Sequence, residues 1–241
     1  GQNFAGWDEI TVEGQKGTML TMRHGEMLND NEGLRSRGND GPEGSIYTEN
    51  LRSAKATGRY ILSGEGVETY HSTATFYGFR YVEVTTTQDV MIHGMKGIVV
   101  TSVAEDTGEI VTSDKDVNQL ISNIFWGQYS NYLSTATDCP QRDERKGWTA
   151  DTQVFSTAAA YNADSKGFLR KYMYDMMDSQ INNEQDRYHG AYPDTAPYNG
   201  YGEIGQLGWG DAGIIIPYNL YKMYGDRTVV EENYASMQSF M

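Results

Sequence analysis

The chain has 241 residues, an apolar fraction of 38% and a net charge of −14, so it holds enough hydrophobic material for one large domain or two small ones. The acidic charge argues against a nucleic-acid partner and against anionic membrane surfaces, because both require a basic binding surface. No run of about 18 consecutive apolar residues is present, so the sequence predicts no membrane-spanning helix.

Both ends of the chain resemble cuts within a longer protein. The first residue is Gly1 rather than Met, and no charged-then-apolar leader follows it. The last residue, Met241, falls within an apolar-periodic segment. We therefore expect an internal fragment.

Residues 1–112 are predicted to form β-strands. Short apolar or β-branched runs alternate with turn residues, and these runs cover 9–12, 19–22, 60–62, 79–84 and 97–100. A polar, Gly-rich loop is expected over 35–44. Many short strands at this spacing indicate an antiparallel sandwich.

From residue 113 onward the apolar period becomes helical. Ser113 or Asp114 is expected to cap a first helix, and further helices are expected over 151–161, after Asp164, over 213–224 and after Asp226. A loop rich in Gly, Tyr, Asn and Asp is expected over about 186–210. We therefore expect two domains, covering 1–112 and 113–241.

The stretch Asp138–Asp151 carries the strongest functional signal. It contains four carboxylates, two arginines and a tryptophan within fourteen residues. In a sugar-cleaving pocket, carboxylates serve as acid, base or hydroxyl acceptors, and an aromatic ring covers the apolar face of the sugar. A solvated helix face is the alternative, but such a face rarely includes a tryptophan and a Cys-Pro pair.

This stretch, DCPQRDERKGWTAD, resembles the signature of bacterial α-L-rhamnosidases of the inverting type. The resemblance extends over essentially the whole chain, through the segments 1–7, 64–84 and 209–226. It implies a jelly-roll or concanavalin-like β-sandwich followed by the first part of an (α/α)6 barrel. About five helices are expected here, so more than half of that barrel is expected to lie outside the chain.

The resemblance also implies an activity, which is hydrolysis of terminal non-reducing α-L-rhamnose residues with inversion. Glu144 matches the general acid of the family, and its pKa must rise through burial or neighbouring carboxylates if it is to stay protonated near neutral pH. Judged without the resemblance, Glu144 would be expected in a salt bridge with Arg142 or Arg145. The general base of the family is a glutamate far downstream, which we expect beyond Met241, so this chain alone is expected to be inactive.

Polar candidates for sugar binding are also implied by the resemblance. Asp138 and Asp151 are similar to the hydroxyl-binding carboxylates of the family, although Asp151 is also a candidate helix cap. Arg142 is expected to bind a hydroxyl or to orient a carboxylate. Asp143 is expected to have a structural role, paired with an arginine.

Two tryptophans are candidates for apolar contact with the sugar. Trp148 is expected to form a wall against rhamnose, with ordinary core packing as the alternative. Trp209 is a second candidate for such a wall. The single cysteine, Cys139, excludes an internal disulfide and is expected to be a structural, partly buried thiol rather than a nucleophile.

Two other classes of function remain open from the sequence. The chain could be a non-catalytic carbohydrate-binding or structural fragment, or part of a different (α/α)6 glycosidase or a lyase. A lyase would need basic residues to neutralise a uronate, whereas this motif is acid-rich. No metal-spaced His or Cys cluster and no phosphate-binding loop is evident, so no metal or cofactor is expected. The expected partner is a rhamnose-containing glycoside or polysaccharide.

Overall fold

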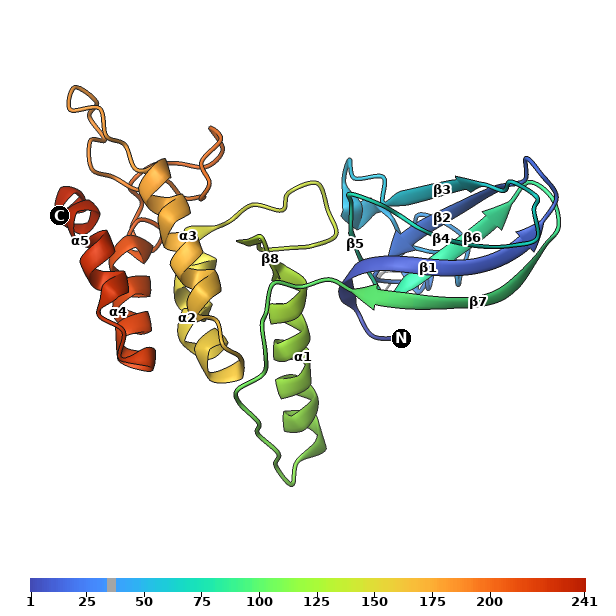
Figure 1. The fold of residues 1–241 in the computed structure, drawn as a ribbon, viewed down its shortest axis with the longest axis horizontal. Helices are drawn as coiled ribbons and strands as arrows, with labels where there is room; N and C mark the ends of the chain where they lie inside the picture. The colour runs from blue at the N-terminus through green and yellow to red at the C-terminus, as the bar shows by residue number, and fades with distance from the viewer. Residues whose placement is uncertain (34–37) are drawn as a thin grey trace. The chain divides into compact units, whose positions relative to one another are not determined.

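The computed structural model describes residues 1–33 and 38–241 (Figure 1). The loop expected over 35–44 falls partly on residues 34–37, which lie outside the described residues. The chain divides into two compact units, which we call the β unit and the helical unit. The β unit comprises Gly1–Thr101 together with Cys139–Arg145, and the helical unit comprises Ser102–Asp138 together with Lys146–Met241.

The first division lies at Thr101 rather than near residue 112, because the residues that follow Thr101 pair with the helical unit. Asp106 forms an isolated β-bridge with Ala163. The backbone N–H of Asp164 donates to the carbonyl oxygen of Glu105 at 2.9 Å. The segment Cys139–Arg145, expected within the second domain, belongs to the β unit.

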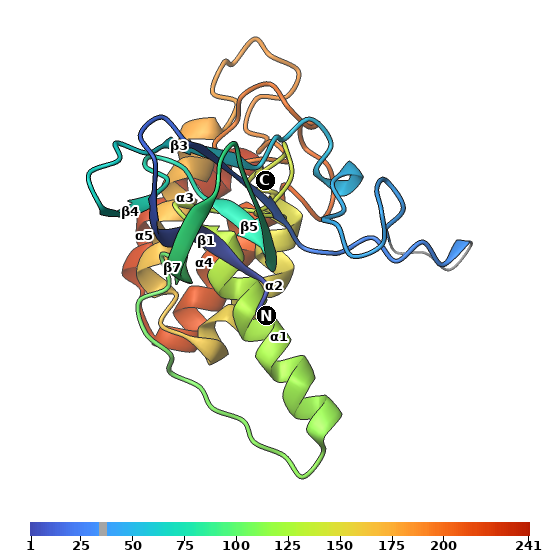
Figure 2. The same ribbon diagram turned by 90° about the vertical axis from the view of Figure 1, so that its right-hand side faces the viewer.

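The strands of the β unit form two antiparallel sheets. The first sheet is built around β1 (Phe4–Gly14), which pairs with β4 (Val67–His71), β5 (Tyr77–Phe79) and β7 (Val90–Val99). The second sheet has the order β3 (Thr57–Ile61), β2 (Met19–Gly25) and β6 (Tyr81–Thr86). Both ribbon views show β1 and β7 running side by side (Figures 1 and 2).

The alternation of apolar residues explains why these strands form a sandwich. Ile10 and Val12 of β1 are fully buried, as are Leu20 and Met22 of β2, and the four side chains share one hydrophobic cluster. Residues two apart on a strand point to the same face, so each sheet offers one apolar face to the other. The predicted antiparallel sandwich is confirmed.

The helical unit contains five helices within the described residues. They are α1 (Lys115–Asn131), α2 (Thr149–Asn162), α3 (Lys166–Ser179), α4 (Ala212–Tyr224) and α5 (Thr228–Phe240). A small hairpin of β8 (Tyr132–Leu133) and β9 (Thr135–Ala136) follows α1. The long segment between α3 and α4, drawn in orange, extends from one end of the helices (Figure 2).

The core of the helical unit is built from the inward faces of α2–α5 and from the long segment before α4. Fully buried members include Leu169, Tyr172 and Ile216 from the helices and Tyr192 from the segment. The predicted order, with antiparallel strands first and helices after them, is confirmed. None of the described helices combines the length and the apolarity that a bilayer crossing requires.

Most helix boundaries agree with the sequence signals. The Asp114 side chain caps α1 by accepting from the N–H groups of Asp116 and Val117, and Gly225 ends α4 with a left-handed φ of 67°. The caps of α3 and α5 fall one residue later than expected, at Ser165 and Arg227. The expected Asp164 and Asp226 still accept from the first N–H of each helix, which explains the shift.

Candidate active site

The segment Cys139–Arg145 of the β unit, which we call the acidic loop, is attached to the residue before β5 by Arg145. The Arg145 guanidinium donates to the carbonyl oxygens of Pro140 and Phe76, both at 2.9 Å, and lies 4.0 Å from the centroid of the Phe76 ring. Burial lowers the pKa of this guanidinium, which nevertheless stays charged at neutral pH. Arg145 therefore has a structural role in the loop.

The candidate acid, Glu144, lies on this loop with only 9% of its side chain exposed. Its Oε2 atom accepts from Arg142 Nε at 2.9 Å. The same oxygen lies 3.1 Å from a terminal nitrogen of Arg52. The salt bridge to Arg142 was foreseen, whereas the contact with Arg52 was not, because nothing in the local sequence links positions so far apart.

Asp143 is paired with an arginine, as expected, and the partner is again Arg52, at 3.8 Å. The Ser53 backbone N–H donates to Asp143 Oδ2 at 3.2 Å, and the Ser53 hydroxyl donates to the same oxygen. The hydrogen bond from the Ser53 hydroxyl is the main cause that lowers the pKa of Asp143 below its ordinary value. Two adjacent loop carboxylates are thus held by two adjacent residues of the β unit.

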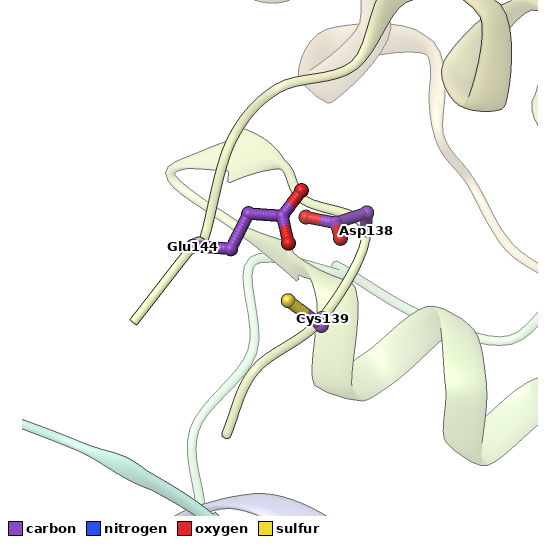
Figure 3. A group of neighbouring side chains, drawn as sticks. All are labelled: Asp138, Cys139 and Glu144. Atoms are coloured by element: carbon purple, nitrogen blue, oxygen red, sulfur yellow. The ribbon is translucent and has the colours of Figure 1, made fainter. Parts of the chain in front are cut away.

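Cys139 is a buried thiol with 4% exposure, which agrees with a structural role. Its Sγ atom lies within 4.8 Å of a Glu144 carboxylate oxygen (Figure 3). Carboxylate and thiolate groups are metal ligands, and Asp138, the residue before Cys139, offers another. The guanidinium groups of Arg52 and Arg142 on Glu144 oppose cation binding at this carboxylate, because they already supply positive charge there.

Arg142 also acts on a second carboxylate of the β unit, Glu26, which the sequence did not single out. Burial raises the pKa of Glu26, while a hydrogen bond from Asn3 at 2.8 Å and the charge of Arg142 act in the opposite direction. Arg142 therefore bonds to Glu144 and also acts by its charge on Glu26. This arrangement suits a residue that orients Glu144.

The helical unit contains an open cleft of about 590 Å³. Its polar lining includes Asp138, which follows β9, and Asp151, in the first turn of α2. The remaining lining residues are Ile124, Gly127, Gln128, Asn131, Tyr132, Ala136, Thr137, Ala150, Thr152, Val154 and Phe155. The structure thus brings together the two carboxylates predicted to bind sugar hydroxyls.

Asp151 does not cap α2. The N-cap position is Trp148, whose side chain makes no capping hydrogen bond, and Asp151 is the third residue of the helix. An exposed carboxylate in the first turn is still favoured by the positive end of the helix dipole. Asp151 thus lines the cleft without occupying the N-cap position of α2.

The two candidate tryptophans lie apart from the lining of this cleft. Trp148 is half-buried and packs edge-to-face on Tyr201, with 5.9 Å between ring centroids. Trp209 is half-buried, and its indole nitrogen has no hydrogen-bond partner among the described residues. Neither tryptophan is among the residues that line the cleft of the described helices.

A buried carboxylate near Trp148 was missed by the sequence reasoning. Asp194 is 3% exposed; its backbone carbonyl accepts from Thr149 N–H at 2.9 Å, and its Oδ2 accepts from Glu203 N–H at 3.0 Å. Burial raises the pKa of the Asp194 carboxyl group. The only local signal is the position after Pro193, which does not distinguish Asp194 from an ordinary loop residue.

Family models match both units of the chain. The model described as the bacterial alpha-L-rhamnosidase 6 hairpin glycosidase domain matches residues 105–241. The model described as the bacterial alpha-L-rhamnosidase concanavalin-like domain matches residues 1–102. Together they match every residue of the chain except 103 and 104.

Curated relatives and solved structures that resemble this chain are also alpha-L-rhamnosidases. An alpha-L-rhamnosidase of Streptomyces avermitilis is 43% identical over 100% of this chain, and one of Formosa agariphila is 36% identical over 100%. The crystal structure of the Streptomyces protein complexed with L-rhamnose has a TM-score of 0.85 at 42% identity over 99% of this chain. That of a native rhamnosidase from Aspergillus terreus has a TM-score of 0.86 at 36% identity over 99%.

The chain is much shorter than these proteins. It spans 22% and 24% of the lengths of the two curated relatives, and 22% and 26% of the two solved chains.

Proposed function

The chain belongs to the bacterial α-L-rhamnosidase family, and from that premise we propose that it supplies part of an enzyme that hydrolyses terminal α-L-rhamnose residues from rhamnosides with inversion. The observation that carries this proposal is the convergence of Asp138 and Asp151 on one cleft. Carboxylates accept two hydroxyl hydrogen bonds each in a defined geometry, which suits the selection of a sugar by its stereochemistry.

Glu144 is the proposed general acid. In the proposed step its proton passes to the glycosidic oxygen as the bond to the anomeric carbon breaks, and the leaving alcohol departs neutral. A second carboxylate removes a proton from the water that attacks the opposite face, and the two carboxyl groups of an inverting pair are about 6.5–9.5 Å apart. We place that base in a part of the relatives' length that this chain does not span.

The surroundings of Glu144 act on its protonation in two opposite directions. Its shielding from water favours the neutral form, whereas the guanidinium groups of Arg52 and Arg142 on Oε2 favour the carboxylate. Activity that needs protonated Glu144 is therefore expected to decline as the pH rises. The arginines also hold the side chain in one orientation, which a proton donor requires.

Three further residues complete the proposed site, and each rests on a different observation. They are Arg142, Trp148 and Trp209. Arg142 touches the candidate acid directly, so we propose that it orients Glu144. Trp148 directly precedes α2, the helix that carries Asp151, and remains a proposed apolar wall for the sugar. Trp209 is proposed from the family resemblance, and it is not among the described residues that line the cleft.

The test is made with an intact protein of the relatives' length. It should release rhamnose from aryl rhamnosides, with the first-formed sugar showing inverted anomeric configuration by NMR. The 241-residue chain alone should release none above background, because the proposed base is not among its residues. Retained configuration, or full activity of the isolated chain, would contradict the proposed mechanism.

A further inference from the structure

We propose that Arg52, contributed by the β unit, is a positioning residue for Glu144; this inference rests on the proposed acid role of Glu144. Arg52 ends the short 3-10 helix Glu49–Leu51, far from the acidic loop in sequence. One terminal nitrogen lies 3.1 Å from Glu144 Oε2, and the other lies 3.8 Å from Asp143 Oδ1. A single guanidinium therefore spans both loop carboxylates.

The neighbouring residue strengthens this attachment. Ser53 donates its backbone N–H to Asp143 Oδ2 at 3.2 Å and its hydroxyl to the same atom. Arg52 and Ser53 thus hold Asp143 and Glu144, while Arg145 attaches the same loop to Phe76. Because a displacement of about 1 Å at a reacting group can cost roughly 100-fold in rate, such attachment matters for a proton donor.

The backbone at Arg52 is strained. Its φ of 57° and ψ of −118° belong to a region that residues with side chains rarely adopt and that glycine adopts readily. A glycine would fit this turn with less strain, yet the position holds the largest cationic side chain. Strained residues concentrate at functional sites, where the surrounding structure maintains them for a purpose.

Folding stability does not account for Arg52. Its side chain is 51% exposed, and half-exposed ion pairs contribute little to stability because water screens them. Glu144, by contrast, is only 9% exposed, so the orientation of its carboxylate is sensitive to the groups that contact it. The contact between Arg52 and Glu144 therefore affects the orientation of the Glu144 carboxylate more than it affects the stability of the fold.

Several charged or titratable groups lie near Glu144. Arg52 and Arg142 both contact Oε2, and the Cys139 thiol lies within 4.8 Å of the carboxylate. Asp143 adjoins it and shares Arg52, while Glu26 acts through Arg142. The full set also includes Arg145, which is directed to Phe76 and Pro140, and Asp138, which precedes Cys139. Arg52 lies outside the acidic loop and contacts Glu144 directly, so its replacement tests this contact without altering the loop itself.

The experiment compares Arg52→Gly, Arg52→Lys and the matched control Arg59→Gln in the intact enzyme. Arg59 is an exposed arginine on β3 of the same unit. With an unactivated rhamnoside, Arg52→Gly should lower kcat by roughly 10- to 100-fold, as expected for a misplaced catalytic group, with little change in KM. The melting temperature should stay level or rise, because glycine relieves the strain. Arg59→Gln should leave all of these unchanged.

The pH profile separates positioning from a merely structural role. Removing a positive charge from beside Glu144 favours its protonated form, so the basic limb of kcat/KM should move to higher pH in Arg52→Gly. Arg52→Lys keeps the positive charge. It should therefore show the basic limb of kcat/KM at the pH of the wild type and should recover part of the lost kcat. If Arg52→Gly does not fold, Arg52→Gln provides the same comparison with the lysine variant.

The outcomes distinguish this inference from the proposed function. If Glu144→Gln abolishes activity while Arg52→Gly keeps the kcat and the pH profile of the parent, the positioning role is overturned and the acid role stands. If Glu144→Gln is fully active, the proposed acid role fails, whatever Arg52 does. A loss in Arg52→Gly that matches a fall in melting temperature, with the basic limb unmoved, would also overturn the positioning role.

Discussion

Asp138 and Asp151 line the same cleft of the helical unit, although one follows β9 and the other lies in the first turn of α2. Replacement of either by asparagine keeps the shape of the side chain and removes its charge. We expect each substitution to weaken the binding of L-rhamnose to the intact enzyme by about 1–3 kcal/mol, the usual loss for a hydrogen bond to a charged group. Isothermal titration calorimetry measures this directly.

The matched control for these two variants is Asp178→Asn. Asp178 is an exposed aspartate of α3 and does not line the cleft. Its replacement should leave the affinity unchanged. Wild-type affinity in both Asp138→Asn and Asp151→Asn would remove these residues from the sugar site.

Glu144→Gln tests the proposed acid. The substitution should lower kcat on a natural rhamnoside by at least about 100-fold, the low end for general acid catalysis. An aryl rhamnoside with an acidic leaving group should be affected less, because its oxygen needs less protonation. Steady-state kinetics on a series of leaving groups provides the measurement.

Glu231→Gln serves as the control for that substitution, since Glu231 is exposed on α5 and pairs only loosely with Arg227 at 3.7 Å. It should have wild-type kinetics. An equal loss on natural and activated substrates for Glu144→Gln would count against proton donation and favour a structural defect.

Asp194 predicts a pH dependence of stability. Burial raises the pKa of this carboxyl group in the folded state, so its contribution is most favourable at low pH and is lost as the pH rises through the folded pKa. Asp194→Asn removes this loss, so the variant should gain stability relative to the wild type between about pH 4, the unfolded value, and neutral pH. Urea denaturation at several pH values measures the difference, and a difference independent of pH would contradict the assignment.

Gly213→Ala tests the packing beneath α4. A Cβ atom at this position would lie 2.1 Å from Cε2 of the fully buried Tyr192 ring. We expect a loss of about 1–3 kcal/mol in the free energy of unfolding, as for other overpacked cores. Gly167→Ala in α3, where a Cβ meets nothing within 4 Å, should instead stabilise by about 0.4–1 kcal/mol.

Local patterns account for most of the fold. The alternation of Ile10 and Val12 and the capping side chain of Asp114 identify a sandwich strand and a helix start from a few neighbouring residues. The start of α2 at Thr149 was placed two residues late, because Trp148 occupies the N-cap position without a capping side chain. Boundaries without a capping residue leave no sequence signal.

The candidate site was less predictable than the fold. The loop residues were recognised from one compact motif, but their partners Arg52 and Glu26 lie in distant segments whose local sequence resembles any polar turn. Such partners become visible only once the chain has folded. The same holds for Asp194, whose burial depends on the long segment that precedes α4.

The chain passes between its two units three times, after Thr101, after Asp138 and after Arg145. Each unit is therefore built from two separate segments of the chain, and neither can be exchanged as one continuous domain. A recombinant that swaps residues 1–101 for the sandwich of another relative would leave the acidic loop facing foreign counterparts of Arg52, Ser53 and Phe76. Functional chimeras are thus expected only when residues 139–145 are inherited from the same parent as the sandwich, so the two segments should be exchanged together.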